Sequence, residues 1–167
     1  MPLCTWPVLC ALALFVAAGC DSDSLGSFAE PEEGTFSARV VGTAAIDYAG
    51  DATFRTNSAP APTPPSYNIR AQIRLVDGTT GSAISFTLYQ EPQLGLQPNV
   101  LGSVRVNGEH FQIQGGTLML TAVSAEEITG HFEHDVRCCA QPLAGLPGIG
   151  GRMAGRFNAS FDGDVYR

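Results

Sequence analysis

The chain contains no lysine, and positive charge is scarce throughout. Its nine basic residues are all arginine, its acidic residues number 16, and the formal net charge of the 167 residues is −7 at pH 7. Nucleic-acid binding depends on basic side chains that contact backbone phosphates, and anionic lipid surfaces attract the same side chains. The composition therefore predicts no nucleic-acid partner and no peripheral docking on anionic lipid.

Long apolar runs are missing too. The run Trp6–Ala18 covers about a dozen residues, whereas a membrane-spanning helix needs roughly 20. Its length is typical of the apolar core of a secretory signal peptide, and small residues close it, as the peptidase cleft requires. We predict that residues 1–19 are a signal peptide; the alternative is a buried N-terminal helix.

The cysteine that follows suggests an attachment point. The stretch Ala17-Ala18-Gly19-Cys20 resembles the lipobox of bacterial lipoproteins. The resemblance implies cleavage before Cys20, a diacylglycerol thioether on its sulfur and acylation of the new amino terminus. Several acyl chains together hold a protein durably on a membrane, so the membrane is the expected partner through Cys20. A plain secretory signal, with a soluble mature protein, is the alternative.

The residues after Cys20 bear on the location within the envelope. An Asp directly after the lipidated cysteine, here Asp21, implies inner-membrane retention in enteric bacteria. An acidic tract such as Asp21–Ser24 resembles a surface-export signal of Bacteroidota-like bacteria. Both implications stay open, and we favour the outer membrane or the cell surface.

Few cysteines remain for the folded part. Of five in the chain, Cys4 and Cys10 belong to the signal peptide, and only Cys138 and Cys139 follow Cys20. The sequence is therefore not a disulfide-rich scaffold. Adjacent Cα atoms are about 3.8 Å apart, below the usual disulfide range of about 4.4–6.8 Å. A vicinal Cys138–Cys139 disulfide would be strained, and two free thiols or a soft-metal site are the alternatives.

Removal of residues 1–19 leaves 148 residues, the size of one domain. Residues 20–33 are acidic and without periodicity, which predicts a flexible tether, and residues 34–167 are predicted to form one domain. Alternation of apolar and polar residues in Tyr67–Val76 is typical of a half-buried antiparallel strand. No convincing helix follows residue 20.

Eight further segments show strand character, and turn residues separate them. We predict an all-β domain, an antiparallel β-sandwich or barrel of about eight to nine short strands. In the last of them, Phe157, Ala159 and Phe161 are expected to point inward. The nine predicted strands are residues 35–42, 52–56, 67–76, 83–90, 103–106, 110–114, 116–123, 127–136 and 154–163.

The order of motifs resembles a group of small, β-rich bacterial lipoproteins without an established activity. Ile128, Gly130 and Phe132 match a late I-x-G-x-F motif, and Gly155 and Phe157 belong to a closing G-x-F-x-x-x-F strand. The resemblance implies the β fold and the envelope location, and it brings no catalytic residues. His134 departs from it, because the group has an apolar residue there.

The densest polar cluster is His131–Asp135. In a strand, His131, Glu133 and Asp135 share one face, and imidazole and carboxylate groups can ligate zinc. Residues in a line converge poorly on one ion, so His110 or Glu109 would have to come from a neighbouring strand. A solvated polar face is the alternative reading. His134 falls on the other face, which favours a core histidine with a satisfied hydrogen bond.

Catalytic motifs are otherwise lacking: no G-x-S-x-G, H-E-x-x-H or glycine-rich phosphate loop occurs. We therefore predict no enzyme activity, no catalytic residue, no metal and no cofactor. The expected role is a non-catalytic binding or structural module on the bacterial envelope, with a small apolar ligand or an envelope protein as partner. The alternatives are a metal-dependent hydrolase that uses His131, Glu133 and His110, and a secreted ligand-binding β-barrel.

Overall fold

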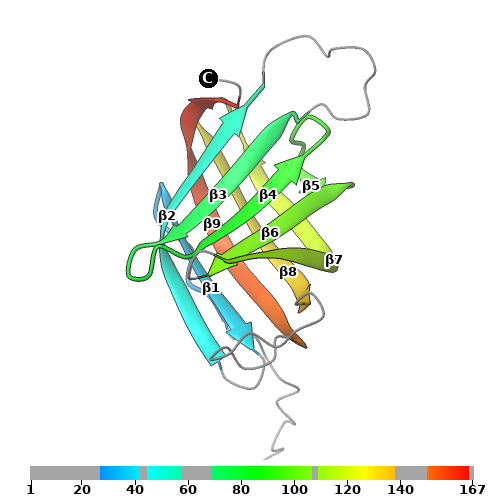
Figure 1. The fold of residues 1–167 in the computed structure, drawn as a ribbon. Coiled ribbons are helices and arrows are strands. Elements are labelled where there is room, and N and C mark those ends of the chain that lie inside the picture. The colour runs from blue at the N-terminus through cyan, green and yellow to red at the C-terminus, as the bar shows by residue number, and fades with distance from the viewer. Residues whose placement is uncertain (1–26, 42–44, 58–68, 107–108, 138–149, 166–167) are drawn as a thin grey trace, which may run out of the picture.

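The computed structural model describes residues 27–41, 45–57, 69–106, 109–137 and 150–165. Within these ranges every regular element is a strand, and all strands belong to one sheet (Figure 1). This confirms the all-β prediction. The strands are β1 (Thr35–Val41), β2 (Ala45–Thr56), β3 (Ala71–Asp77), β4 (Ala83–Leu88), β5 (Gly95–Leu96), β6 (Val100–Val106), β7 (Glu109–Val123), β8 (Glu127–Arg137) and β9 (Gly150–Asp164).

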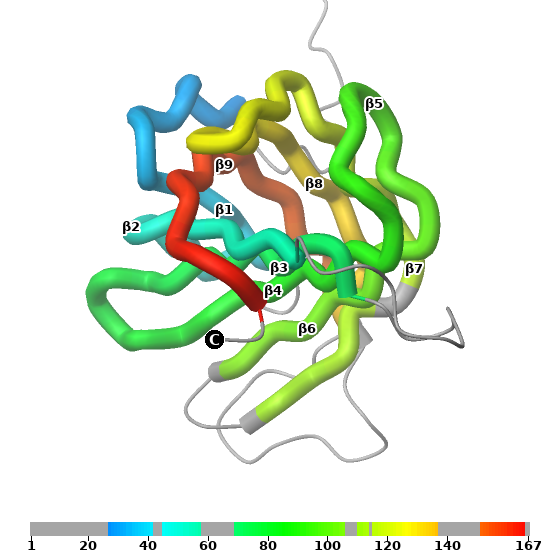
Figure 2. The backbone as a smooth tube through the Cα atoms, turned by 90° about the horizontal axis from the view of Figure 1, so that it is seen from above, coloured from blue at the N-terminus to red at the C-terminus, as the bar shows by residue number. Residues whose placement is uncertain are grey.

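The sheet closes on itself. Its order is β5-β7-β6-β4-β3-β2-β1-β9-β8, and β7 also pairs with β8, so eight strands form a ring to which β5 is added. Figure 2 looks down on this ring. Neighbouring strands are antiparallel, apart from a short parallel pairing of β2 with β9. Closure pairs the backbone groups that an open sheet would leave bare at its two edges.

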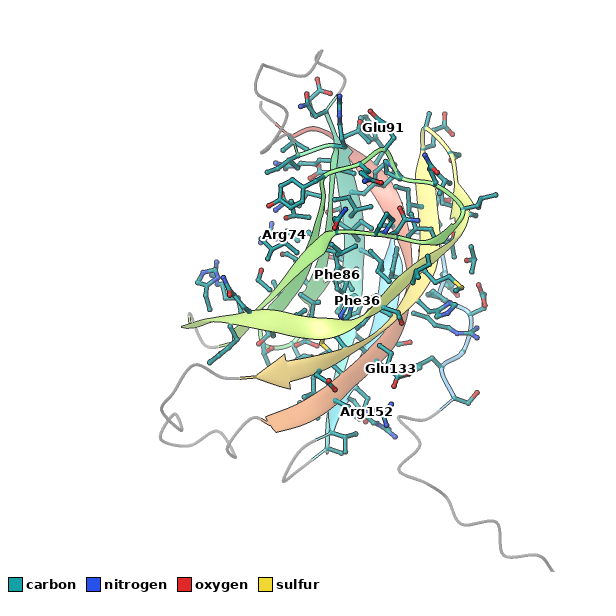
Figure 3. The ribbon with its side chains drawn as sticks, turned by 90° about the vertical axis from the view of Figure 1, so that its right-hand side faces the viewer. Phe36, Arg74, Phe86, Glu91, Glu133 and Arg152 are labelled. Atoms are coloured by element: carbon teal, nitrogen blue, oxygen red, sulfur yellow. The ribbon has the colours of Figure 1, made fainter. Side chains whose placement is uncertain are left out.

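Successive side chains of each strand point alternately into the ring and out of it, and those that point inward are mostly apolar. Phe54, Phe86, Phe132 and Phe157 are each less than 2 % exposed. Figure 3 shows Phe86 and Phe36 between the walls of the sheet. Burying a side chain of this size contributes about 1.5–3 kcal/mol, so the aromatic interior is the main support of the fold.

The hairpin of β3 and β4 turns between the predicted strands 67–76 and 83–90, at Asp77 and the residues after it. The Asp77 side chain is 5 % exposed. Its Oδ1 accepts hydrogen bonds from the Thr79 and Thr80 amides and the Thr80 hydroxyl, and its Oδ2 accepts one from the Ala49 amide at 3.1 Å. The aspartate thus fixes the turn and ties it to β2.

Two of the predicted strands are one strand in the structure. Residues 110–114 and 116–123 both belong to β7, because Gly115 and Gly116 form a bulge, with φ of 73° and 103°, instead of a turn. A Cβ on Gly116 would collide with the Glu133 carbonyl oxygen, so only glycine allows β8 to approach this closely. The sequence also gave no indication of β5 or of the first half of β2.

One predicted core residue is misplaced. Phe161 is 46 % exposed, whereas Phe157 and Ala159 are buried as expected. The pairing of β9 with β1 ends at Asn158, and β9 then runs on beside β2 near the end of the ring. Phe161 packs there against Phe54, with ring centroids 5.5 Å apart, and its other side faces solvent.

Candidate functional site

The proposed metal ligands do not come together. His131 and Glu133 lie on the exposed face of β8, where Glu133 forms an ion pair with Arg152 of β9. Figure 3 shows Glu133 and Arg152 close together on this wall. His131 is opposite Met119, nine positions along β7 from His110, which corresponds to roughly 25–30 Å. Among the described residues, no three His, Cys, Asp or Glu side chains form a metal-binding group.

Two other predicted positions fall outside the part of the chain that the structure describes. These are the lipidation candidate Cys20 and the cysteine pair Cys138–Cys139. The side chain of Glu109 is likewise not described.

His134 is a core histidine, as its apolar face predicts. The residue is 6 % exposed, its ring stacks on Phe86 with centroids 5.4 Å apart, and its Nδ1 lies 2.6 Å from the Gly115 carbonyl oxygen. Burial lowers the pKa of His134 below its usual value, and the hydrogen bond to Gly115 and the nearby Asp135 charge oppose this only in part. The neutral imidazole therefore carries its proton on Nδ1 and donates it to the Gly115 carbonyl oxygen, and Nε2 has a lone pair that can accept a hydrogen bond.

A small hollow adjoins this histidine. It has a volume of about 200 Å³ and is lined by Gln97, Asn99, Gly102, the bulge of β7 and His134. Nε2 of His134 has no hydrogen-bond partner among the described residues. The hollow has room for water, which would satisfy the buried nitrogen.

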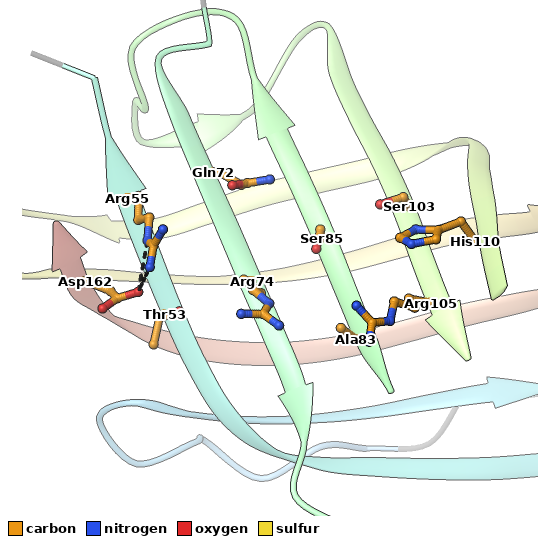
Figure 4. Close-up of a pocket in the computed structure, with 10 residues that line it drawn as sticks. All are labelled: Thr53, Arg55, Gln72, Arg74, Ala83, Ser85, Ser103, Arg105, His110 and Asp162. Carbon is orange, nitrogen blue, oxygen red and sulfur yellow. Dashed lines mark hydrogen bonds and ion pairs between the residues drawn. The ribbon is translucent and has the colours of Figure 1, made fainter. Parts of the chain in front are cut away.

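A larger groove lies on the outer face of the sheet. It has a volume of about 320 Å³ and crosses β2, β3, β4, β6 and β7 (Figure 4). The strand register builds it in three rows, of which Arg55 and Gln72 form the first, because directly paired residues of antiparallel strands have their side chains on the same face. The second row is Thr53, Arg74, Ser85 and Ser103, and the third contains Ala83, Arg105 and His110.

The depth of the groove comes from side-chain size. Ala83, Ser85 and Ser103 are short and form the floor along β4 and β6. Arg74 on β3 and Arg105 on β6 are long and stand on either side of β4. In Figure 4 the Arg105 side chain extends toward β4, and the Arg74 guanidinium group lies over β3.

The charges in the groove are unusual for this protein. Seven arginine side chains are described, and five of them form ion pairs with carboxylates. The other two, Arg74 and Arg105, have no ion pair in the described part of the chain, and both line this groove. Arg55 lies at one end, where Asp162 of β9 accepts its hydrogen bond at 2.7 Å. The arrangement offers two exposed cations that no described carboxylate pairs with, and serine hydroxyls beside them, to an acidic group.

Sequence reasoning placed Arg74 on the polar face of its strand but did not identify the groove. The available signal was the scarcity of cations: with nine arginines and no lysine in the chain, each arginine on an outward strand position is a candidate for a positive area. Ring closure and register decide which arginines meet a carboxylate, and neither can be obtained from one strand alone.

Comparison with known proteins adds no assignment. No protein-family model matches the chain, and neither a curated protein nor a solved structure matches it significantly. Within the described residues, no helix has the length and apolar character to cross a bilayer.

Proposed function

We propose that this chain is a lipid-anchored protein of the bacterial envelope whose β domain is a non-catalytic binding module for an acidic ligand. The supporting observation is that, in a protein of net charge −7, Arg74 and Arg105 are the two described arginines without a carboxylate partner and share one groove. The anchor rests on the lipobox-like sequence that ends at Cys20.

The lining of the groove favours an acidic ligand over the small apolar ligand expected from the sequence. Its residues are arginines, short hydroxyl side chains, a glutamine and a histidine, with Ala83 as the apolar exception and Asp162, which is paired with Arg55, as the one carboxylate. Arginine presents a planar fork of donors that suits oxyanions, and serine hydroxyls add further donors. An apolar ligand would leave these groups without partners.

Binding is also favoured over catalysis. A serine nucleophile needs a base within hydrogen-bond reach, and His110 makes no hydrogen bond to Ser85 or Ser103 in the described residues. The metal-dependent hydrolase loses its support because His110 lies far from His131 and Glu133. We therefore assign the groove residues to ligand recognition.

The test of binding is retention on supports that carry phosphorylated, carboxylated or neutral polysaccharides. The full chain, purified in a non-ionic detergent, should be retained by the acidic supports at low salt and not by the neutral one. The double variant Arg74→Gln/Arg105→Gln should lose retention. Arg39→Gln is the matched control, because Arg39 pairs with Asp47 outside the groove. Retention that survives the double substitution, or no retention at all, would contradict the proposal.

The anchor has a separate test. Intact-mass measurement of the protein purified from its native membrane should give a chain that begins at Cys20 with acyl mass added. The Cys20→Ser variant should lack that mass and leave the membrane fraction. An unmodified wild-type chain cleaved elsewhere would point to the secreted, soluble alternative.

A further inference from the structure

We propose that the groove holds one phosphate group as a dianion, between the guanidinium groups of Arg74 and Arg105 and above Ser85. This inference rests on the proposed function and makes its ligand specific. The shared chemistry is a terminal phosphate, either as the free ion or as a phosphate monoester on a larger molecule.

The register sets the two arginines at a suitable separation. Arg74 is opposite Ser85, and Ser85 is opposite Ser103, so β4 alone separates the two arginine-bearing strands. Arg105 is two positions further along β6 than Ser103. With strands about 4.8 Å apart and a rise of about 3.4 Å per residue, the two Cα atoms lie roughly 12 Å apart. An arginine side chain is long enough to reach over β4 from either side, so both guanidinium groups can contact one compact anion.

The number of donors and their directions favour a tetrahedral group. The two guanidinium forks stand on opposite sides of β4, and Ser85 lies beside them on that strand, one row away from Ala83 (Figure 4). A carboxylate has two oxygens in one plane, so it serves one fork well and the second poorly. A phosphate monoester has three oxygens in different directions, which can meet both forks and the hydroxyl.

The charge also matches. Arg74 and Arg105 carry two positive charges that no described carboxylate balances. A phosphate monoester carries about −1.5 to −2 at pH 7, whereas a phosphate diester, a sulfate ester or a carboxylate carries about −1. A dianion removes the repulsion between the two guanidinium groups most completely. The described lining of the groove holds no Phe, Tyr or Trp, so His110 offers the one described ring on which a nucleobase could stack, which favours a ligand without a base.

Calorimetric titration with small compounds of similar size tests the charge and shape directly. The probes are ethyl phosphate, diethyl phosphate, ethyl sulfate and propionate, each added to the full chain in detergent at low ionic strength. We expect ethyl phosphate to bind at least about tenfold more tightly than the monoanions, because it adds a charge-assisted hydrogen bond. Arg74→Gln and Arg105→Gln should each weaken ethyl phosphate about tenfold, and Arg39→Gln should not change it.

Two further probes identify the source of the phosphate, and either result supports the proposal. Inorganic phosphate that binds as tightly as ethyl phosphate would identify the free ion as the ligand. Glucose 6-phosphate that binds at least tenfold more tightly than inorganic phosphate would identify a phosphorylated sugar, whose hydroxyl groups reach the other polar side chains of the groove.

Failure of this inference is distinguishable from failure of the proposed function. Equal affinity for ethyl phosphate, ethyl sulfate and propionate, all lost in Arg74→Gln, would overturn the phosphate assignment and leave an acidic-ligand site. Ethyl phosphate binding that is unchanged in Arg74→Gln and Arg105→Gln would place the site elsewhere and overturn the inference. Absence of all binding, together with no retention on the acidic supports, would overturn both. Because the arginines are exposed and unpaired, both variants should fold, which thermal unfolding verifies.

Discussion

Acidification should weaken the fold through His134. Burial lowers the pKa of this imidazole below 6.5, so the folded state resists a proton that the unfolded state accepts. The stabilising contribution of the neutral ring is therefore complete above the unfolded pKa of about 6.5. It is lost as the pH falls from there toward the lower pKa of the folded state.

The structure limits the size of this effect. The ring is 6 % exposed, stacks on Phe86 and uses its one proton for the Gly115 carbonyl oxygen. One proton excluded from the folded state changes the free energy of unfolding by at most about 1.4 kcal/mol per pH unit. Between pH 6.5 and the pKa of the folded state, His134 therefore contributes a slope that approaches this limit and does not exceed it.

Comparison with His134→Phe isolates the contribution. The variant keeps an aromatic ring beside Phe86 and loses the hydrogen bond to the Gly115 carbonyl oxygen. Gly115 is exposed, so water can donate to that oxygen instead. We expect a loss of about 1 kcal/mol at pH 8, from one hydrogen bond. Urea unfolding between pH 8 and pH 5 should show this difference shrinking as the pH falls. Parallel pH profiles for the two proteins would refute the reasoning.

Three further predictions concern local contacts and are tested by urea unfolding, two of them with a control substitution. Gly116→Ala should destabilise the fold by about 2–4 kcal/mol, because the new Cβ would collide with backbone at a residue of positive φ. Gly81→Ala, also at positive φ but in open space, should cost only about 1 kcal/mol. Equal losses would contradict the close approach of β8 to Gly116. Burial alone would raise the pKa of Asp77, but its hydrogen bonds hold that pKa below 3.8. Asp77→Ala should therefore cost about 1–3 kcal/mol at pH 7. The cost should shrink below pH 4, because the unfolded state takes up a proton there before the folded state does; a cost independent of pH would oppose this. Phe132→Ala should cost about 3–5 kcal/mol, whereas Phe161→Ala, at a half-exposed position, should cost clearly less.

Local patterns determined much of this fold. Strict alternation in β3 and β4 and the Asp77 turn predicted one hairpin with its inward residues. The sequence of Gly115 and Gly116 predicted a turn, because glycine at positive φ is typical of both turns and bulges. Only the pairing of β7 with β8 on both sides of these glycines shows that the strand continues.

Long-range pairing accounts for what the sequence could not show. Phe161 alternates correctly with Phe157, yet it is exposed because β1 ends beside Asn158. Arg74 and Arg55 lie on outward positions of adjacent strands, and only the position of Asp162 distinguishes them. A carboxylate that reaches one arginine from β9 depends on how the ring closes, which no single strand encodes.

The net charge of the protein and the charge of its groove act over different distances. At physiological ionic strength the Debye length is about 8 Å, so a ligand responds chiefly to charges within that distance. A compact dianion between Arg74 and Arg105 therefore interacts mainly with those two cations. Asp162 is paired with Arg55, and Asp51 lies on the exposed face of β2 beyond Arg74, so neither carboxylate removes the positive charge between Arg74 and Arg105. An acidic group can therefore be attracted to this groove although the protein as a whole is negatively charged.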